Sequence, residues 1–100
     1  MPRPVLTTPE ADADIEDAFG WYETHAPGLG SDFLAELAVT FSSLEEFPEA
    51  HPKIRGETRR AVIHRFPYGV FYIAGPDLTS VTGVLHFRRD PRAWPRSADV

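Results

Sequence analysis

The 100-residue sequence predicts a single α+β domain, in which a hairpin of two helices packs on one face of a small antiparallel sheet. Three observations predict this fold. Apolar residues recur at helical spacing in the first half of the chain, they alternate at strand spacing in the second half, and hydrophobic residues make up 42% of the whole. That content supports one buried core, and the length is that of one ordinary domain, so residues 1–100 are expected to form a single domain.

The chain is expected to begin with a short edge strand at residues 4–7 and then to enter a helix. Thr8 is a suitable N-cap, and Pro9 suits the first helical position because it has no N–H to leave unpaired there. An apolar stripe between residues 11 and 22 follows at helical spacing, and most of the remaining positions are acidic or small.

A second helix should follow almost at once. The run 27–30, Pro-Gly-Leu-Gly, breaks the first helix, and Ser31 with Asp32 is expected to open the next one. Its apolar stripe runs from residue 33 to residue 47, and Pro48 ends it. Because the connection is short, the two helices should pack as an antiparallel hairpin.

Three strands are predicted after a polar link at residues 49–57. They span residues 58–66, 68–74 and 79–87, and their short connections predict an antiparallel meander. The element order is therefore β-α-α-β-β-β. The alternation of the third strand, from which Val84 departs, predicts which side chains face the helices. We expect Val81, Leu85 and Phe87 on the core face and Ser80, Thr82 and His86 on the open face.

Charge is distributed unevenly along the chain. Residues 1–50 hold one arginine and eleven carboxylates, whereas residues 51–100 hold nine basic residues and four carboxylates, although the net charge is -5. The second half can therefore present a basic face to an anionic partner. The absence of cysteine excludes disulfides and thiolate metal sites. Without an apolar leader or membrane-length segment, the protein is expected in the cytoplasm and away from membranes.

Several segments together resemble the RelE/ParE superfamily of type II toxins, and in particular its ParE-like subgroup, which includes plasmid stabilisation proteins. The helix entry 8–15, the hairpin segment 21–34 and the strand pair 59–72 each resemble the corresponding part of that subgroup. The C-terminal segment 86–94, His-Phe-Arg-Arg-Asp-Pro-Arg-Ala-Trp, is similar to its ending. The resemblance covers nearly the whole chain and implies the same α+β fold.

The resemblance implies two different activities. RelE-like members are ribosome-dependent endoribonucleases that cut messenger RNA, whereas ParE-like members are described as inhibitors of DNA gyrase. When this sequence is aligned with the nuclease members, it keeps a basic residue at Arg60 and at Arg88. It has Val62, Gly69 and Trp94 where those members have a basic residue, an arginine and a tyrosine. Since tryptophan cannot exchange a proton as tyrosine can, this pattern argues against RelE-type cleavage.

Two histidines keep a nuclease hypothesis open. Strand alternation predicts His64 and His86 on the open face with Arg60, and histidine titrates nearest to neutral pH. If the chain is a nuclease, its catalytic residues would be Arg60, His64, His86 and Arg88. The simpler interpretation, which we favour, is that His86 hydrogen-bonds its neighbours and orders the C-terminal segment. No histidine pair has metal-site spacing, and no metal or cofactor is expected.

The sequence therefore predicts the toxin of a type II toxin–antitoxin pair, neutralised by a cognate antitoxin and acting on DNA gyrase by binding. A ribosome-dependent endoribonuclease acting on mRNA is the first alternative, and a non-toxic antitoxin-binding module is the second. Enzymatic activity belongs to the first alternative alone. Arginine pairs carboxylates bidentately, so a basic and aromatic set should bind the antitoxin or target. This set consists of Arg59, Arg65, Arg89, Arg92 and Trp94.

Overall fold

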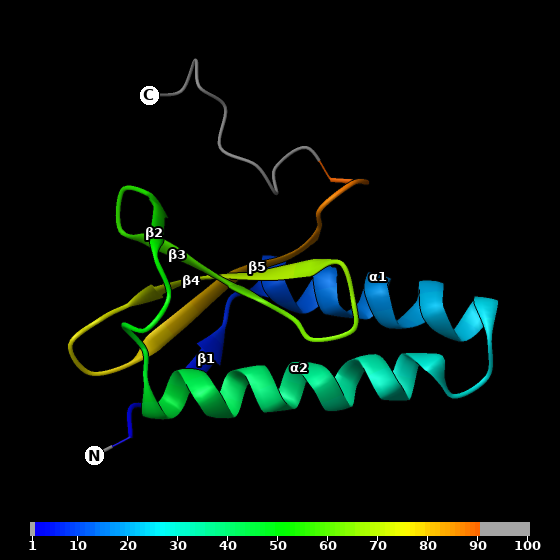
Figure 1. Cartoon of the computed structure of the whole chain (residues 1–100), viewed down its shortest axis with the longest axis horizontal. Helices are drawn as coiled ribbons and strands as arrows, with labels where there is room; N and C mark the ends of the chain where they lie inside the picture. The colour runs from blue at the N-terminus through cyan, green and yellow to red at the C-terminus, as the bar shows by residue number, and fades with distance from the viewer. Residues whose placement is uncertain (1, 91–100) are drawn as a thin grey trace.

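The computed structural model describes residues 2–90, which form a helical hairpin under a single sheet (Figure 1). The elements are β1 (Val5–Thr7), α1 (Pro9–His25), α2 (Leu29–Glu46), β2 (Lys53–Arg55), β3 (Thr58–Val62), β4 (Tyr68–Ala74) and β5 (Thr79–His86). The sheet order is β1-β5-β4-β3-β2, antiparallel except for the parallel pair of β1 and β5. The α+β class and the hairpin on one face are confirmed.

The helices begin where local chemistry allows. Thr8 caps α1 as predicted, because its Oγ1 accepts a hydrogen bond of 3.2 Å from the backbone N–H of Ala11. Helix α2 begins at Leu29, earlier than predicted, because Gly28 adopts a left-handed φ of 87° that turns the chain at once. The helices approach closely at Gly30, where a Cβ would lie 2.8 Å from the carbonyl oxygen of Phe19.

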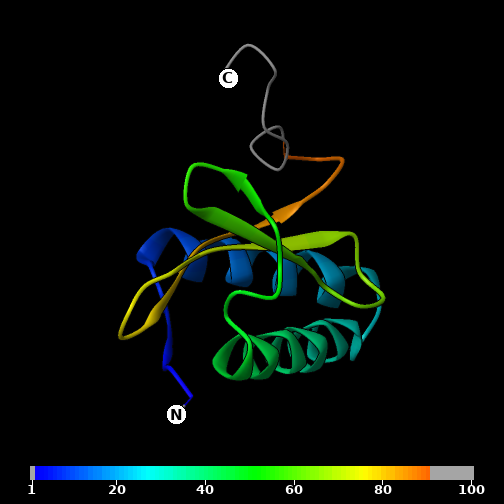
Figure 2. The same cartoon turned by 60° about the vertical axis from the view of Figure 1, so that its left-hand side comes forward.

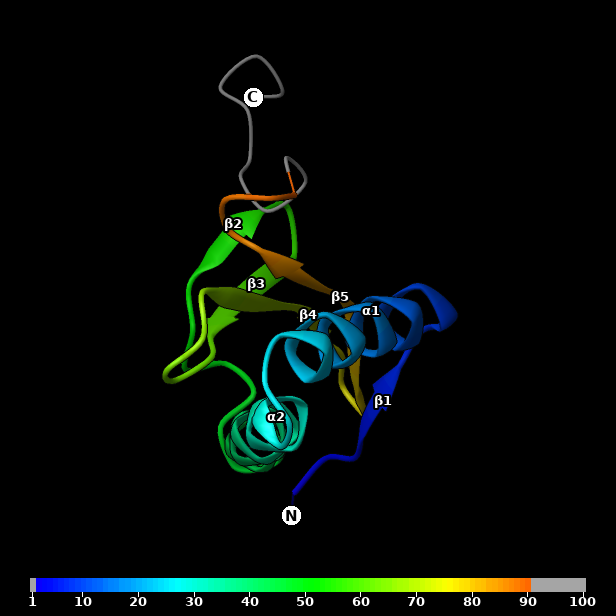
Figure 3. The ribbon, with the colours of Figure 1, turned by 90° about the vertical axis from the view of Figure 1, so that its right-hand side faces the viewer.

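The main core lies between this hairpin and the sheet. Figures 2 and 3 show both helices on the same side of the strands. Four aromatic rings from α1, α2 and the segment before and within β4 pack together, with centroids between 5.0 and 6.0 Å apart. They belong to Tyr22, Phe33, Phe66 and Tyr68. Within residues 2–90, neither helix is long and apolar enough to cross a bilayer.

Two of the predicted strand boundaries are wrong. The polar link at residues 49–57 contains β2, which pairs with the start of β3 and forms an edge of the sheet. The strand predicted over residues 58–66 ends at Val62. The chain turns there because Arg65 adopts a left-handed φ of 73°, which is incompatible with an extended strand. His64 consequently lies in a turn and not in the sheet.

The predicted alternation of β5 is wrong beyond Val81 because the strand contains a bulge. Phe71 pairs with Gly83 and Tyr72 pairs with Val81, so Thr82 is the extra residue. An extra residue reverses which side each later side chain faces. The main core therefore takes up Val84, and the open face takes up Leu85 with Phe87, in a second apolar cluster that also contains Phe71 and Ile54.

Helix α1 completes the hydrogen bonding of β5 beyond the bulge. Strand β1 pairs with β5 only as far as Val81. Beyond it, the backbone N–H of Val84 donates to Oδ2 of Asp14 over 3.1 Å. The Asp14 carboxylate thus takes the place of the strand neighbour that β5 lacks here. A buried N–H left without an acceptor is costly, so this contact should help to fix the bulge.

Replacing Asp14 with alanine should destabilise the fold by about 1–3 kcal/mol, because the Val84 N–H loses its acceptor. Asp14→Asn keeps an oxygen at that position and should recover much of the loss. Asp17→Ala removes an exposed acid from the same helix and should change the free energy of unfolding by less than about 0.5 kcal/mol. Urea unfolding measures all three, and equal effects of the two alanine variants would contradict the proposed contact.

Candidate functional site

The open face of the sheet, on the side away from the helices, carries a groove of ≈ 230 Å³. Its floor is apolar, since Phe71 and Leu85 are each 6% exposed and pack with Ile54 and Phe87. Hydroxyl and guanidinium groups stand at its rim. The lining residues are Ile54, Arg55, Thr58, Phe71, Thr82, Gly83 and Leu85. The face therefore offers an apolar depression with a polar rim, which is suited to holding an apolar group.

Arg60 lies on this open face, as predicted. Its guanidinium carbon stands 5.5 Å from the centroid of the Phe87 ring. Phe87 also closes the position of Gly69, where a Cβ would lie 3.0 Å from Phe87, 3.1 Å from Arg60 and 3.1 Å from Phe71. Val62 is 60% exposed at the end of β3. The two positions where the nuclease members carry further cations are therefore a valine and a glycine in this chain, and neither supplies a charge.

The prediction that His64 lies on the open face is wrong. Its Nδ1 is 3.6 Å from a carboxylate oxygen of Glu36 in α2, and its side chain is 81% exposed. Arg65 points to the same helix, with guanidinium nitrogens 3.7 Å from Glu36 and 3.9 Å from Asp32. Both residues therefore join the β3–β4 turn to α2. They are not brought together with Arg60.

His86 also lies on the other side from the one predicted, because it follows the bulge. It pairs with Tyr68 of β4, and the two rings meet edge to face with centroids 5.1 Å apart. Its Nδ1 accepts hydrogen bonds of 3.0 Å from the backbone N–H groups of Arg88 and Arg89. Burial lowers the pKa of His86, and the neighbouring charges of Arg89 and Arg88 lower it further. These are the neighbour contacts that the simpler interpretation expects.

Arg89 joins the end of β5 to α1. Its Nη2 donates to the Tyr68 hydroxyl over 2.9 Å, and its guanidinium carbon lies 3.9 Å from the centroid of the Trp21 ring. Trp21 in turn stacks on His25, with centroids 3.7 Å apart and an angle of 24° between the planes. Burial raises the pKa of Tyr68, opposed by Arg89, so this hydroxyl stays protonated near neutral pH.

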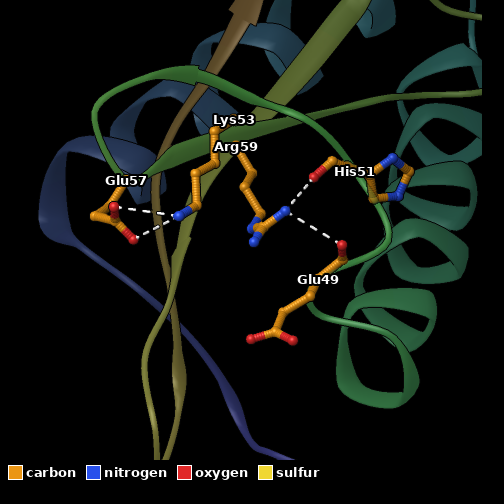
Figure 4. A network of polar contacts seen from close by, with 5 residues as sticks. All are labelled: Glu49, His51, Lys53, Glu57 and Arg59. Carbon is orange, nitrogen blue, oxygen red and sulfur yellow. Dashed lines mark hydrogen bonds and ion pairs between the residues drawn. The ribbon is translucent and has the colours of Figure 1, made fainter.

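Arg59, the neighbour of Arg60, points to the opposite side of the strand. Figure 4 shows its Nη1 reaching two backbone carbonyls of the segment after α2, at 2.6 Å to His51 and 3.2 Å to Glu49. The same figure shows Lys53 paired with Glu57 across the β2–β3 hairpin at 3.1 Å. Arg59 therefore connects the sheet to that segment, and its role in binding stays a prediction.

Arg88 is exposed in the turn after β5. Arg92 and Trp94, two further residues of the predicted binding set, lie outside the described residues. Sequence reasoning missed Trp21 and Tyr68, which together hold Arg89. The signal for Trp21 was its position beside the apolar stripe of α1, but its partner lies 68 positions along the chain. Among residues 2–90, no three His, Cys, Asp or Glu side chains gather as a metal site would require.

Comparison with solved structures places this arrangement among known folds. The chain superimposes with a TM-score of 0.73 on a chain described as the chromosomal ParDE TA system from P. aeruginosa. The match covers 84% of this chain and 95% of that chain at 11% sequence identity, so it shows a shared fold. No significant match to a curated protein is found.

The fold is that of a small α+β domain in which a helical hairpin covers one face of a five-stranded sheet. Residues 5–91 match the family described as the ParE toxin of the type II toxin–antitoxin system, parDE. The chain belongs to this family, and it is a toxin component of the type II class. This confirms the resemblance to ParE-like proteins.

The neighbours Arg59 and Arg60 allow a matched test of the two sides of β3. Arg59→Met should cost about 1.5 kcal/mol or more of stability, because two carbonyls lose a charged donor. Arg60→Met should cost less, about 1 kcal/mol, since its half-buried guanidinium stands over the Phe87 ring, and such a contact is of modest strength. Urea unfolding of both variants against the wild type measures the difference, and a larger loss in Arg60→Met would reverse the assignment.

Proposed function

We propose that this chain is a toxin that acts on DNA gyrase by binding and is neutralised by a cognate antitoxin. Its membership of the ParE toxin family supports this proposal, together with the character of its open face. The observation that carries the proposal is the separation of the titratable groups from that face. RNA cleavage without a metal needs an acid and a base beside a cationic phosphate site.

The described residues of the open face do not meet that need. Arg60 stands there beside Phe87, over an apolar groove. His64 lies against Glu36 of α2, and the Nδ1 of His86 is taken up by the turn after β5. No histidine of residues 2–90 therefore stands on the open face beside Arg60, which favours binding over hydrolysis.

The proposed antitoxin contact follows from the chemistry of the same surface. An apolar side chain can enter the groove between Phe71 and Leu85, while carboxylates of the same segment can pair with the guanidinium of Arg55, which lines the groove. Such a segment is a short acidic and apolar tail. It would wrap a toxin of this size without needing a deep pocket, since a few buried anchors carry most binding energy.

Purified chain should inhibit the supercoiling of relaxed plasmid by DNA gyrase, and adding the cognate antitoxin should relieve the inhibition. Gyrase should keep its full activity in two controls, one with buffer alone and one with the heat-unfolded chain. The measurement is the band pattern of the plasmid on an agarose gel. Full supercoiling at a large molar excess of folded chain would overturn the gyrase proposal.

Replacing Leu85 with aspartate should weaken antitoxin binding at least about tenfold, because a charge in the apolar groove opposes an apolar anchor. Leu85→Met keeps the apolar volume and serves as the matched control. Circular dichroism first establishes that each variant folds, and calorimetric titration with the antitoxin then gives the affinity. Unchanged affinity in a folded Leu85→Asp variant would exclude the groove as the docking site.

Two further assays of the purified or expressed chain distinguish the gyrase proposal from its two alternatives. Ribosome-bound mRNA probed by primer extension should show no new ends under the gyrase proposal. An endoribonuclease would instead produce new ends, and these would be absent with the His86→Ala variant. Induced expression without the antitoxin should stop growth under the gyrase proposal. Normal growth with a folded, abundant chain would instead favour a non-toxic antitoxin-binding module.

A further inference from the structure

The turn after β5 depends on the protonation state of one imidazole. Two backbone N–H groups, those of Arg88 and Arg89, point at the Nδ1 of His86. Because both are donors, Nδ1 must present its lone pair, and the ring proton is carried by Nε2. The backbone N–H of Asp90 donates to the carbonyl oxygen of His86 over 3.1 Å and closes the turn. The observed geometry therefore requires a neutral His86.

The turn after β5 also positions the side chain of Arg89. The guanidinium carbon of Arg89 and the ring of His25 lie 3.9 and 3.7 Å from the centroid of the same Trp21 ring. Two groups this close to one centroid cannot share a face of the ring, so they cover opposite faces. The Tyr68 hydroxyl holds Arg89 from the sheet side at 2.9 Å. A chain of contacts thus runs from His86 to α1.

We propose that His86 is a positioning residue that acts as a proton-sensitive latch for the segment after β5. When the imidazole is neutral, it holds the backbone of Arg88 and Arg89 so that the Arg89 guanidinium sits between Tyr68 and Trp21. When Nδ1 takes up a proton, its N–H opposes two other N–H groups, and the latch opens. This role is independent of the target of the toxin.

The two charges that act on His86, those of Arg89 and Arg88, both lower its pKa. The turn contributes Arg88 and Arg89, and β4 contributes the neutral Tyr68 hydroxyl. From α1, the carboxylate of Asp17 acts on Tyr68. Burial and the two arginines lower the pKa of His86 below its usual value of about 6.5. The folded chain thus binds fewer protons at His86 than the unfolded chain does. The contribution of neutral His86 to the stability of the fold is therefore complete above about pH 6.5 and is lost as the pH falls through the lowered pKa.

Amide hydrogen exchange followed by NMR on the isolated chain tests the latch directly. As the pH falls from about 8 through the pKa of His86, the protection of the Arg88 and Arg89 amides should drop by about tenfold over the pH unit below that pKa, after correction for intrinsic exchange. The ¹⁵N shifts of the ring should report the Nε2–H tautomer above that point. Protection that stays constant through the titration of His86 would overturn the proposal.

Two variants distinguish a latch from a residue that merely fills space. His86→Asn places Oδ1 where Nδ1 was and cannot take up a proton, so both amides should stay protected at every pH. His86→Phe keeps a ring without an acceptor, and protection should be lost at every pH. Because His25 also touches Trp21, His25→Gln is the matched control and should keep the wild-type pH dependence. The wild-type pH dependence in His86→Asn would refute the latch, even if His86→Phe does not fold.

These measurements need neither gyrase nor an antitoxin. A chain that fails to inhibit gyrase can still show the latch, and a chain that lacks the latch can still inhibit gyrase. The two proposals therefore fail separately.

Discussion

The bulge at Thr82 is the constraint on which the arrangement of the functional side chains depends. One extra residue in β5 turns Val84 and His86 toward the helices and Leu85 and Phe87 toward the open face. The apolar groove, the pairing of His86 with Tyr68 and the approach of the following turn to α1 all follow from that reversal. The carboxylate of Asp14 helps to hold the strand in this phase, because it accepts from the Val84 N–H that no strand reaches.

Much of the fold could be predicted because its signals are local. The cap formed by Thr8 and the apolar stripes of both helices depend on residues within a few positions of one another. The bulge could not be predicted in the same way, since the Asp14 carboxylate that bonds the strand beyond it lies 70 positions away in the sequence. Its one local sign was Val84, an apolar residue at a position that the alternation assigned to solvent. Val84 directly follows Gly83, which has no side chain to pack.

The site residues divide along the same line. Arg60 was placed correctly because it lies inside a regular strand, whereas His64 was not, because the left-handed Arg65 ends that strand early. The contact of Arg89 with Trp21 joins residues from opposite ends of the chain and leaves no periodic pattern to detect. Sequence reasoning therefore recovered the family and the order of all elements except β2, but it missed the side chains that connect β5 to α1.

The closure of Gly69 also limits how this domain could change its chemistry. The two phenylalanine rings and the stem of Arg60 already occupy the space that a side chain at this position would enter. An arginine there, as nuclease relatives have, would have to displace Phe87 and open the apolar cluster beneath it. The groove and a full cationic phosphate site are thus competing uses of one surface. An arginine at position 69 would therefore require a compensating substitution at Phe87 or Phe71, because the arginine alone would damage the packing of this cluster.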